Sequence, residues 1–519
     1  MNGAEILVHT LLGGNVDVCF SNPGTSEMHF VSALDRIEGM RCVLGLHETV
    51  VTGAADGYYR IADRPAATLL HLGPGLTNGL ANLHNAKKAR SGIINIVGDH
   101  AIDHLKLDAP LTSDIQGFAA PVSQWVHTSP SVDAIAADGA AAIRAANARP
   151  GQIATLILPA NVAWTEGPPA RPHVASGQPA PSAPPVHDFK RIVQALRDDP
   201  RPTLLLLGDR ALRANCTGLA GRIAAATGAQ LRAEFYYARH ERGAGRVVVP
   251  RIPYAVEPAL AVLQQFQRVI LVNAKAPVAF FAYPDKPGRL LPPGCEVLTL
   301  STVEDDPCAA LAALCRELGA DTLAPAGVAQ PAAQPAALTG PLTADSIALA
   351  LAATLPEQAI VVDEAVTTGR CFDAALAAAA PHDWLTGCGG AIGFGLPTAL
   401  GAAIAAPDRR VVALEGDGSG MYSPQALWSM ARENVNVTVV VFVNRAYSIL
   451  RGELTAVGAG APGARATDML SLDRPDIDWA GLSRSMGVEA CSVRDVAALA
   501  EALKHSFATP GPRLIEAIL

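Results

Sequence analysis

Short apolar runs rich in Val, Ile and Leu recur along the whole chain, separated by longer stretches rich in Ala and Leu. Unbroken apolar runs are typical of strands buried on both faces, as in a parallel sheet, and the longer stretches between them have the composition of helices. The pattern therefore predicts an α/β protein made of doubly wound parallel sheets. The expected strands are residues 17–20, 66–71, 93–98, 203–208, 268–273, 296–301, 359–364, 410–416 and 437–444.

Two stretches rich in Pro, Ala and Gly divide these strands into three groups. They are Gly167–Pro185 and Ala324–Pro341, and both are almost free of charged and aromatic residues, which is typical of linkers. A chain of 519 residues is also longer than one hydrophobic core usually serves. We therefore expect three doubly wound domains, over residues 1–166, 186–323 and 342–519.

Composition and charge exclude several classes of function. With a net charge of −8 and no basic block, the chain is not expected to bind nucleic acid. No apolar run reaches the roughly 18 residues of a membrane span, so no membrane association is expected. The nine cysteines are scattered without a CxxC pair, which argues against a zinc site and against a disulfide framework. The first residues lack the features of a signal peptide, and we expect a cytoplasmic protein.

The segment EGDGSGMYS, residues 415–423, follows a buried run, and the next buried run ends in Asn444. The carboxyl ends of parallel strands share one sheet edge, so Asp417 and Asn444 are expected side by side. Their oxygens are hard ligands that suit Mg²⁺, while Gly416 and Gly418 allow a phosphate to approach the backbone. An ordinary strand–turn–helix with Asp in the turn is the alternative interpretation of GDG alone.

With 25 residues between Gly418 and Asn444, the segment resembles the thiamine diphosphate (ThDP) binding signature. The usual signature has two asparagines, and Val443 replaces the first. The resemblance implies three metal ligands, namely Asp417, Asn444 and the backbone carbonyl of Ala446. It further implies that the diphosphate lies against Gly416, Gly418, Ser419, Asn444 and Tyr447.

Residues 43–71 resemble the pyrimidine-binding domain of the same superfamily, which makes residues 342–519 the diphosphate-binding domain and residues 186–323 the middle domain. The resemblance implies that Glu48 hydrogen-bonds N1′ of the aminopyrimidine and favours the imino tautomer, whose nitrogen can take the C2 proton. A glutamate stabilised by the dipole at a helix start is the structural alternative.

Residues 385–397 resemble the segment that bends the cofactor. There Ile392 matches the apolar wedge under the two rings, and Gly390 would offer its carbonyl to the 4′-amino group. By periodicity alone Ile392 is a core residue. The family places the activating glutamate and the diphosphate site on different subunits, which implies a homodimer as the minimal active unit and favours a homotetramer.

The motifs NPGTSE, residues 22–27, and GPGLTN, residues 73–78, resemble the group that contains acetolactate synthase, pyruvate oxidase and benzoylformate decarboxylase. Within this group the chain is most similar to acetolactate synthase large-subunit-like proteins, with benzoylformate decarboxylase as a close relative. His71 aligns with an active-site histidine of that decarboxylase, and Thr25 keeps a hydroxyl where it has serine. Both are therefore catalytic candidates, although His71 also fits a buried structural histidine.

A second active-site histidine of that decarboxylase, in its middle domain, has no counterpart in residues 276–288, where Tyr283 is the nearest polar candidate. No dinucleotide motif follows the first strand of the middle domain, and the glycine-rich run at 240–246 is short, so no FAD is expected. Roles for four other polar residues stay open, with solvated loop positions as the alternative: His47, His100, His104 and Lys106.

The resemblance implies decarboxylation of a small 2-oxo acid with ThDP and Mg²⁺ as cofactors. The product step is either carboligation, as in acetolactate synthase, or protonation to an aldehyde, which His71 favours. Alternatives are a simple decarboxylase of the benzoylformate type, and a ThDP-dependent lyase or hydrolase for a 2-hydroxyacyl-CoA or cyclic diketone. A non-catalytic ThDP-fold subunit is disfavoured because Glu48, Asp417 and Asn444 are all present.

Overall fold

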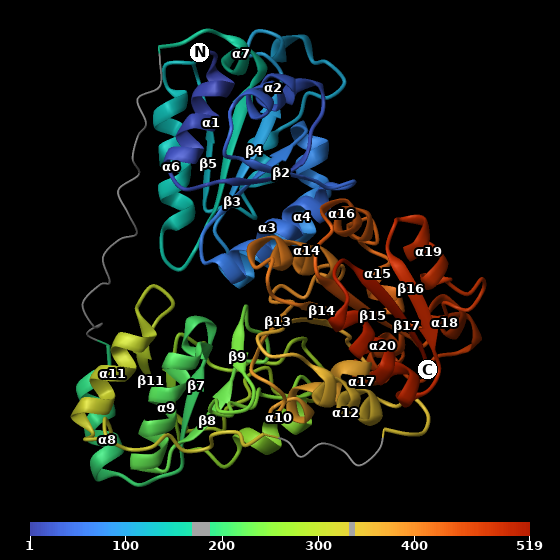
Figure 1. The fold of residues 1–519 in the computed structure, drawn as a ribbon. Coiled ribbons are helices and arrows are strands. Elements are labelled where there is room, and N and C mark those ends of the chain that lie inside the picture. Colours follow the sequence, from blue (N-terminus) through green and yellow to red (C-terminus); the bar gives the residue numbers. More distant parts are fainter. Residues whose placement is uncertain (169–186, 332–337) are drawn as a thin grey trace.

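The computed structural model describes residues 1–168, 187–331 and 338–519. They form three α/β units, each around one sheet, which appear in blue, green to yellow, and orange to red in Figure 1. The predicted fold class is confirmed, and all nine expected strands are present within about one or two residues of their predicted limits.

The first sheet has six parallel strands in the order β2-β1-β3-β4-β6-β5. One apolar cluster lies between one face and α1, α2 and α6, and a second lies between the other face and α3 and α4. The strands are β1 (Val18–Asn22), β2 (Arg41–Leu44), β3 (Ala66–Leu70), β4 (Ile93–Asp99), β5 (Trp125–Thr128) and β6 (Ile153–Pro159). The helices are α1 (Gly3–Gly13), α2 (Met28–Arg36), α3 (Glu48–Ala62), α4 (Leu72–Ala89), α5 (Ile115–Ala119), α6 (Ile135–Asn147) and α7 (Ala160–Trp164).

The second sheet has four parallel strands in the order β11-β10-β7-β8. The strands are β7 (Thr203–Leu207), β8 (Gln230–Ala233), β10 (Arg268–Val272) and β11 (Glu296–Ser301). The helices are α8 (Phe189–Asp198), α9 (Ala214–Thr227), α10 (Val256–Leu263) and α11 (Pro307–Glu317). Helices α8, α9 and α11 share one apolar cluster, and α10 covers the opposite face.

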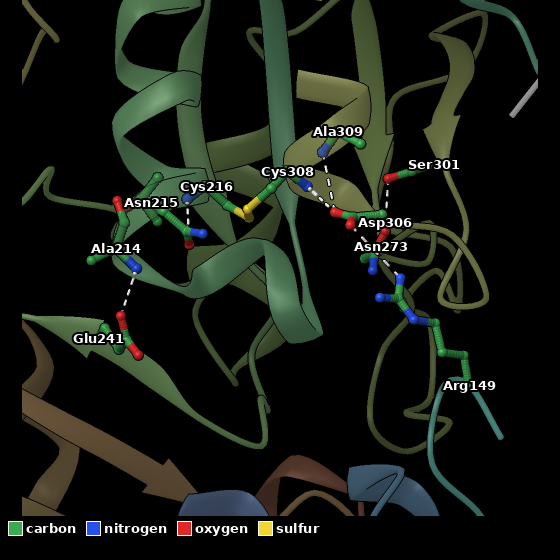
Figure 2. Close-up of a disulfide and its surroundings, with 11 residues drawn as sticks. Arg149, Ala214, Asn215, Cys216, Glu241, Asn273, Ser301, Asp306, Cys308 and Ala309 are labelled. Carbon is green, nitrogen blue, oxygen red and sulfur yellow. Dashed lines mark hydrogen bonds and ion pairs between the residues drawn. A yellow bond between two sulfur atoms is a disulfide. The ribbon is translucent and has the colours of Figure 1, made fainter. Parts of the chain in front are cut away.

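The expectation of no disulfide framework is wrong in the second unit. Cys216 and Cys308 form a disulfide across a sequence separation of 92 residues, as Figure 2 shows. Cys216 lies in α9 and Cys308 lies in α11, and these two helices pack side by side on the sheet. Spacing along the chain could not indicate the pair because only the packing of the two helices brings the sulfurs together.

The third sheet has seven strands in the order β16-β17-β15-β14-β12-β13-β9. Six are parallel, and β9, from the glycine-rich run at 240–246, is an antiparallel edge strand that pairs with β13. The strands are β9 (His240–Arg242), β12 (Ile360–Glu364), β13 (His382–Thr386), β14 (Val411–Gly416), β15 (Val437–Val443), β16 (Glu489–Val493) and β17 (Arg513–Ile518). The helices are α12 (Ala344–Thr354), α13 (Phe372–Ala375), α14 (Gly395–Ala405), α15 (Asp417–Gly420), α16 (Ala426–Glu433), α17 (Ser448–Ala456), α18 (Ala464–Met469), α19 (Trp479–Ser485) and α20 (Val496–Ala508).

The first and third units meet where α3 packs against α14, near the centre of Figure 1. Glycines allow the close approach, since a Cβ on Gly57 would overlap the backbone of Thr398 and one on Gly401 would overlap the backbone of Ala54. Buried Arg60 crosses the same interface and donates to the carbonyl of Thr386 at 2.7 Å.

Most of the first predicted linker and the centre of the second, residues 332–337, lie outside the described residues. The domain limits placed at these linkers stay a prediction. Within the part of the chain that the structure describes, no helix has the length and apolar character needed to cross a membrane.

Candidate active site

Asp417 and Asn444 lie side by side at the carboxyl ends of neighbouring strands. Gly416 at the end of β14 is in register with Phe442 in β15, so the residues that follow each strand meet at one edge. Asp417 accepts hydrogen bonds from the backbone N–H of Arg445 at 2.6 Å and of Gly418 at 3.0 Å. Burial raises the pKa of Asp417. A carboxylate is thus held rigidly at the position that the sequence predicts.

The turn after β15 places two further oxygens beside this carboxylate. The side-chain oxygen of Asn444 accepts the N–H of Ala446 at 2.9 Å, and Arg445 takes a left-handed φ of 55° that turns the chain back. The carbonyl of Ala446 accepts no hydrogen bond from the described residues. The described residues also contain no cluster of three or more His, Cys, Asp or Glu side chains that could bind a metal. The donor set is therefore one carboxylate, one amide and one carbonyl, which suits Mg²⁺ completed by phosphate oxygens.

The turn between Gly416 and Ser419 follows β14 directly. The hydroxyl of Ser419 accepts the N–H of Gly416 at 3.0 Å. The ring of Tyr447 lies directly on Gly418, where a Cβ would come within 2.6 Å of the ring. A larger residue at position 418 would have to displace this ring, so glycine is favoured there, and Tyr447 lies against one side of the turn.

The loop that carries Gly390 and Ile392 joins β13 to α14. Ile392 is 40 % exposed, so the alternative that it is a core residue is not supported. Gly390 has a φ of 72°, which favours glycine. Asn85 of α4 pairs with both backbone groups of Ala391, at 2.9 and 3.1 Å. The first unit of the chain therefore orients this loop.

Glu364 supports the same loop from beneath, and the sequence patterns did not single it out. It ends β12, is buried, and accepts the N–H groups of Gly393 and Gly395 at 2.7 Å each. Glu415 lies against it, and burial together with the adjacent Glu364 raises the pKa of Glu415 far above its usual value. Glu415 is therefore the protonated member of the pair. A glutamate that ends an otherwise apolar strand was the available signal.

Glu48 begins α3 and is 8 % exposed, between α3 and α4. Its Oε2 accepts a hydrogen bond from the side chain of Asn78 at 3.0 Å. Its Oε1 faces Gly75, where an added Cβ would lie 3.1 Å away. His47 caps the helix by accepting the N–H of Thr49 at 3.1 Å, which gives this histidine a structural role. Burial and a side-chain partner are more than stabilisation of a helix end requires.

His71 pairs with Glu27, a residue that the sequence patterns did not single out. Nδ1 of His71 lies 2.8 Å from Glu27, which also accepts the N–H of Gly24 at 2.7 Å. Glu27 is buried, and this burial raises its pKa. Gly24 contacts the imidazole so closely that any Cβ would overlap the ring. Thr25 is exposed and begins the 3₁₀ turn that ends at Glu27.

The loop after β4 holds the other polar candidates. The rings of His100 and His104 lie 5.3 Å apart, and Lys106 is exposed. Nε2 of His100 is buried and has no hydrogen-bond partner among the described residues. This arrangement does not indicate a role for these side chains, and their roles stay open.

A cavity of about 360 Å³ lies at the carboxyl ends of β7 and β8 in the middle unit. Its lining includes Glu234, Tyr236, Tyr254, Lys275 and Phe280. Burial raises the pKa of Glu234 to about 7. The prediction that the middle unit binds no FAD stays a prediction.

Two sets of candidate residues therefore stand on different units. Glu48, His71 and Thr25 belong to the first sheet, and Asp417, Asn444 and Tyr447 belong to the third. No hydrogen bond among the described residues joins the two sets. Apolar side chains are exposed near each set, namely Met28, Leu46, Ile392, Met421 and Tyr422.

Comparison with known proteins relates this site to a family. Residues 1–122 match the N-terminal TPP binding domain of thiamine pyrophosphate enzymes, and residues 367–517 match the C-terminal TPP binding domain. The chain is 50 % identical to the Mycobacterium tuberculosis protein IlvX, which carries the name of an acetolactate synthase large subunit, over 100 % of this chain and 99 % of that protein. It is 30 % identical to benzoylformate decarboxylase of Pseudomonas aeruginosa, over 96 % of this chain and 95 % of the other.

A solved structure has the same fold. It is the ThDP-dependent 4-hydroxybenzoylformate decarboxylase of Rhodococcus jostii, with a TM-score of 0.82, 24 % identity and coverage of 99 % of this chain and 98 % of the other. The resemblance inferred from the GDG and Glu48 segments is confirmed. The chain belongs to the thiamine pyrophosphate enzymes.

Proposed function

We propose that the chain decarboxylates a small 2-oxo acid with ThDP and Mg²⁺ as cofactors. The observation that carries this proposal is the pairing of Asp417 with Asn444 at the ends of β14 and β15, where backbone hydrogen bonds fix both side chains. This donor set suits a magnesium diphosphate and places it where ligands of parallel sheets bind.

The cofactor-binding roles follow from the shape of the site. Asp417, Asn444 and the carbonyl of Ala446 would bind the metal, and Gly416, Gly418, Ser419 and Tyr447 would surround the diphosphate. Ile392 would support the rings, and the carbonyl of Gly390 would accept from the 4′-amino group. When bound, ThDP supplies an electron sink for the electrons released as CO₂ leaves.

The protein's own carboxylates and imidazole would manage the protons. With Oε2 of Glu48 bonded to Asn78, Oε1 faces Gly75 and would hold the proton of a pyrimidine nitrogen. The bond from Nδ1 of His71 to Glu27 leaves Nε2 outside the hydrogen bonds of the described residues, so Nε2 would be able to deliver a proton to the product carbon. Thr25 adds a hydroxyl on the same side.

We further propose that a second copy of the chain completes each site. Glu48 and Asp417 have no link within the described residues of one chain, and exposed Leu46 and Ile392 give both sets an apolar border. A homodimer in which each copy brings its Glu48 to the other's Asp417 would bury this surface, and two such dimers would form a tetramer. A cytoplasmic location is part of the proposal, supported by seven cysteines that the structure leaves unpaired among the described residues.

Two product steps, protonation and carboligation, would compete at the same site. The Glu27–His71 pair supports protonation to an aldehyde, because it holds a proton carrier in place. The similarity to a protein named acetolactate synthase supports carboligation to a second carbonyl compound. Both product steps would follow the same decarboxylation.

A panel of 2-oxo acids, supplied with ThDP and Mg²⁺, tests the proposal by CO₂ release and identification of products. We expect CO₂ from at least one acid, and Glu48→Gln should reduce turnover by about 10²-fold or more with every acid that reacts. Wild-type turnover by Glu48→Gln would contradict the mechanism. Tryptophan fluorescence during ThDP titration shows whether the variant still folds and binds.

A further inference from the structure

One loop of the middle unit contacts two segments of the third unit, the loop that carries Gly390 and Ile392 and the end of helix α17. Near its start, residues 276–288 place Phe280 against Gly390, where an added Cβ would lie 2.9 Å from the ring. Further along, Pro284 lies against Gly458, just beyond α17, where an added Cβ would lie 3.1 Å away. Residues 276–288 therefore form a wall between α17 and the ring-binding loop, which is the loop that carries Gly390 and Ile392.

Helix α17 begins directly after the proposed cofactor ligands. Its N-cap is Tyr447, whose ring lies on Gly418. Leu450 and Glu453 follow at a spacing of three residues, which puts them on neighbouring positions of one helix face, with Glu453 about 9 Å along the axis from Tyr447. Leu450 is 46 % exposed. This face of α17 extends from the turn at residues 416–419 towards the wall formed by residues 276–288.

Glu453 is held in that position by the loop. The hydroxyl of Tyr283 donates to Oε2 of Glu453 at 3.1 Å. Burial, and then the neighbouring Tyr254 and Glu453, raise the pKa of Tyr283 above its usual value, so its O–H remains a donor. Oε1 of Glu453 has no hydrogen-bond partner among the described residues, and Glu453 forms no ion pair there. A half-buried carboxylate thus keeps one acceptor oxygen available.

We propose that Glu453, positioned by Tyr283, binds a hydrogen-bond donor at the distal end of the substrate side chain. This inference rests on the proposed function. The substrate class is then a 2-oxo acid whose side chain ends in a hydroxyl or a cationic nitrogen. A carboxylate accepts but cannot donate, so a substrate side chain without a donor would leave it unpaired. A bound substrate that excludes water and offers no donor would leave the Glu453 carboxylate without a partner. Such a cost discriminates strongly against that substrate.

Matched pairs of 2-oxo acids test the proposal. One pair is 4-hydroxybenzoylformate with benzoylformate, and the other is 2-oxo-5-guanidinopentanoate with 2-oxooctanoate. We expect wild-type kcat/KM to favour the donor-bearing member of at least one pair by about tenfold or more. Glu453→Leu should remove this preference, and Tyr283→Phe should reduce it a few-fold because Glu453 loses its support.

Glu453→Gln distinguishes the two kinds of donor. It keeps an acceptor oxygen but loses the charge, so it should retain a preference for the hydroxyl and lose one for the guanidinium group. It also serves as the test if Glu453→Leu does not fold. Glu501→Gln, on an exposed position of α20, is the matched control and should keep the wild-type ratios.

The possible failures are distinct. If the wild type releases CO₂ but prefers neither donor-bearing acid, or if a folded Glu453→Leu or Glu453→Gln keeps a guanidinium preference unchanged, the role of Glu453 is overturned and the proposed function stands. If no acid in either pair or in the wider panel releases CO₂, the proposed function fails and the inference falls with it.

Discussion

At the scale of single residues, buried carboxylates set the chemistry of the site. Glu48, Glu27 and Glu364 are each buried, and each has a specific partner, which is Asn78, His71 or the backbone of the ring-binding loop. Burying a carboxylate is costly unless it is hydrogen-bonded, so each of these side chains is held in one orientation. That fixed orientation is what proton transfer and cofactor positioning require.

Glu27→Gln tests the orientation of His71. The amide keeps the size of the side chain but weakens the bond to Nδ1, so the imidazole is held less firmly and Nε2 is less well placed to deliver a proton. We expect kcat/KM for aldehyde release to fall by about 10-fold to 100-fold, with little change in ThDP binding. A variant with full aldehyde release would show that the Glu27–His71 pair is only structural.

Glu234 in the cavity of the middle unit should make stability depend on pH. Burial raises its pKa from the usual 4.5 to about 7, so between these values the folded protein holds a proton that the unfolded chain has released. Its contribution is present below pH 4.5 and is lost as pH rises towards 7, by up to about 3 kcal/mol. Denaturant unfolding at pH 5 and pH 7.5 should show a smaller loss for Glu234→Gln than for wild type. Equal losses in both proteins would contradict the assignment.

At the scale of elements, the site depends on how closely helices pack. Helix α3 carries Glu48 at its start, and α14 follows the loop that carries Ile392. Their close crossing at Gly57 and Gly401 therefore fixes the first unit against the third within one chain. Helix α4 adds Asn82 and Asn85, which contact the same loop.

Gly57→Ala tests this crossing. The new Cβ would meet the backbone of Thr398, which cannot move aside as a flexible side chain could, so we expect destabilisation of about 1–3 kcal/mol and loss of soluble protein. Gly218→Ala is the matched control, since Gly218 lies inside α9 with nothing within 4 Å of an added Cβ. It should stabilise the protein by about 0.5–1 kcal/mol. Equal effects on Tm would contradict the importance of the α3–α14 contact.

At the scale of the whole molecule, one arginine of the middle unit links it to both other units. Arg239 of the middle unit pairs with Asp383 of the third at 2.9 Å and donates to the carbonyl of Arg60 in the first at 3.2 Å. Strand β9 adds to this link by extending the third sheet from the middle unit. One chain thus links all three units, yet no hydrogen bond among the described residues joins the two halves of its proposed site.

Mixing two inactive variants tests whether a second copy completes the site. Glu48→Gln and Asp417→Ala damage different units, so a mixed dimer would contain one site with both changes and one native site. If subunits exchange at random, about a quarter of wild-type activity should return. Size-exclusion chromatography of each variant shows that both still assemble. No recovery after exchange of labelled subunits would place both halves of the site in one chain.

The sequence alone determined the architecture and the cofactor. The apolar runs that became strands β14 and β15 are local patterns, and parallel pairing forces residues that follow such strands to one edge, so Asp417 and Asn444 could be placed together from their spacing. Glu48 and Ile392 were proposed differently, because each lies inside a short segment that resembles the family, and their roles stay predictions.

Only the tertiary structure decided which distant side chains meet. Glu27 and His71 are 44 residues apart, Tyr283 and Glu453 are 170 apart, and the disulfide between Cys216 and Cys308 closes a separation of 92. These contacts depend on how loops and helices from separate units pack, and no periodicity of one segment records the position of another. Each segment of the predicted cofactor site is local in sequence and could therefore be recognised, whereas the contact between Tyr283 and Glu453 joins two units and could not.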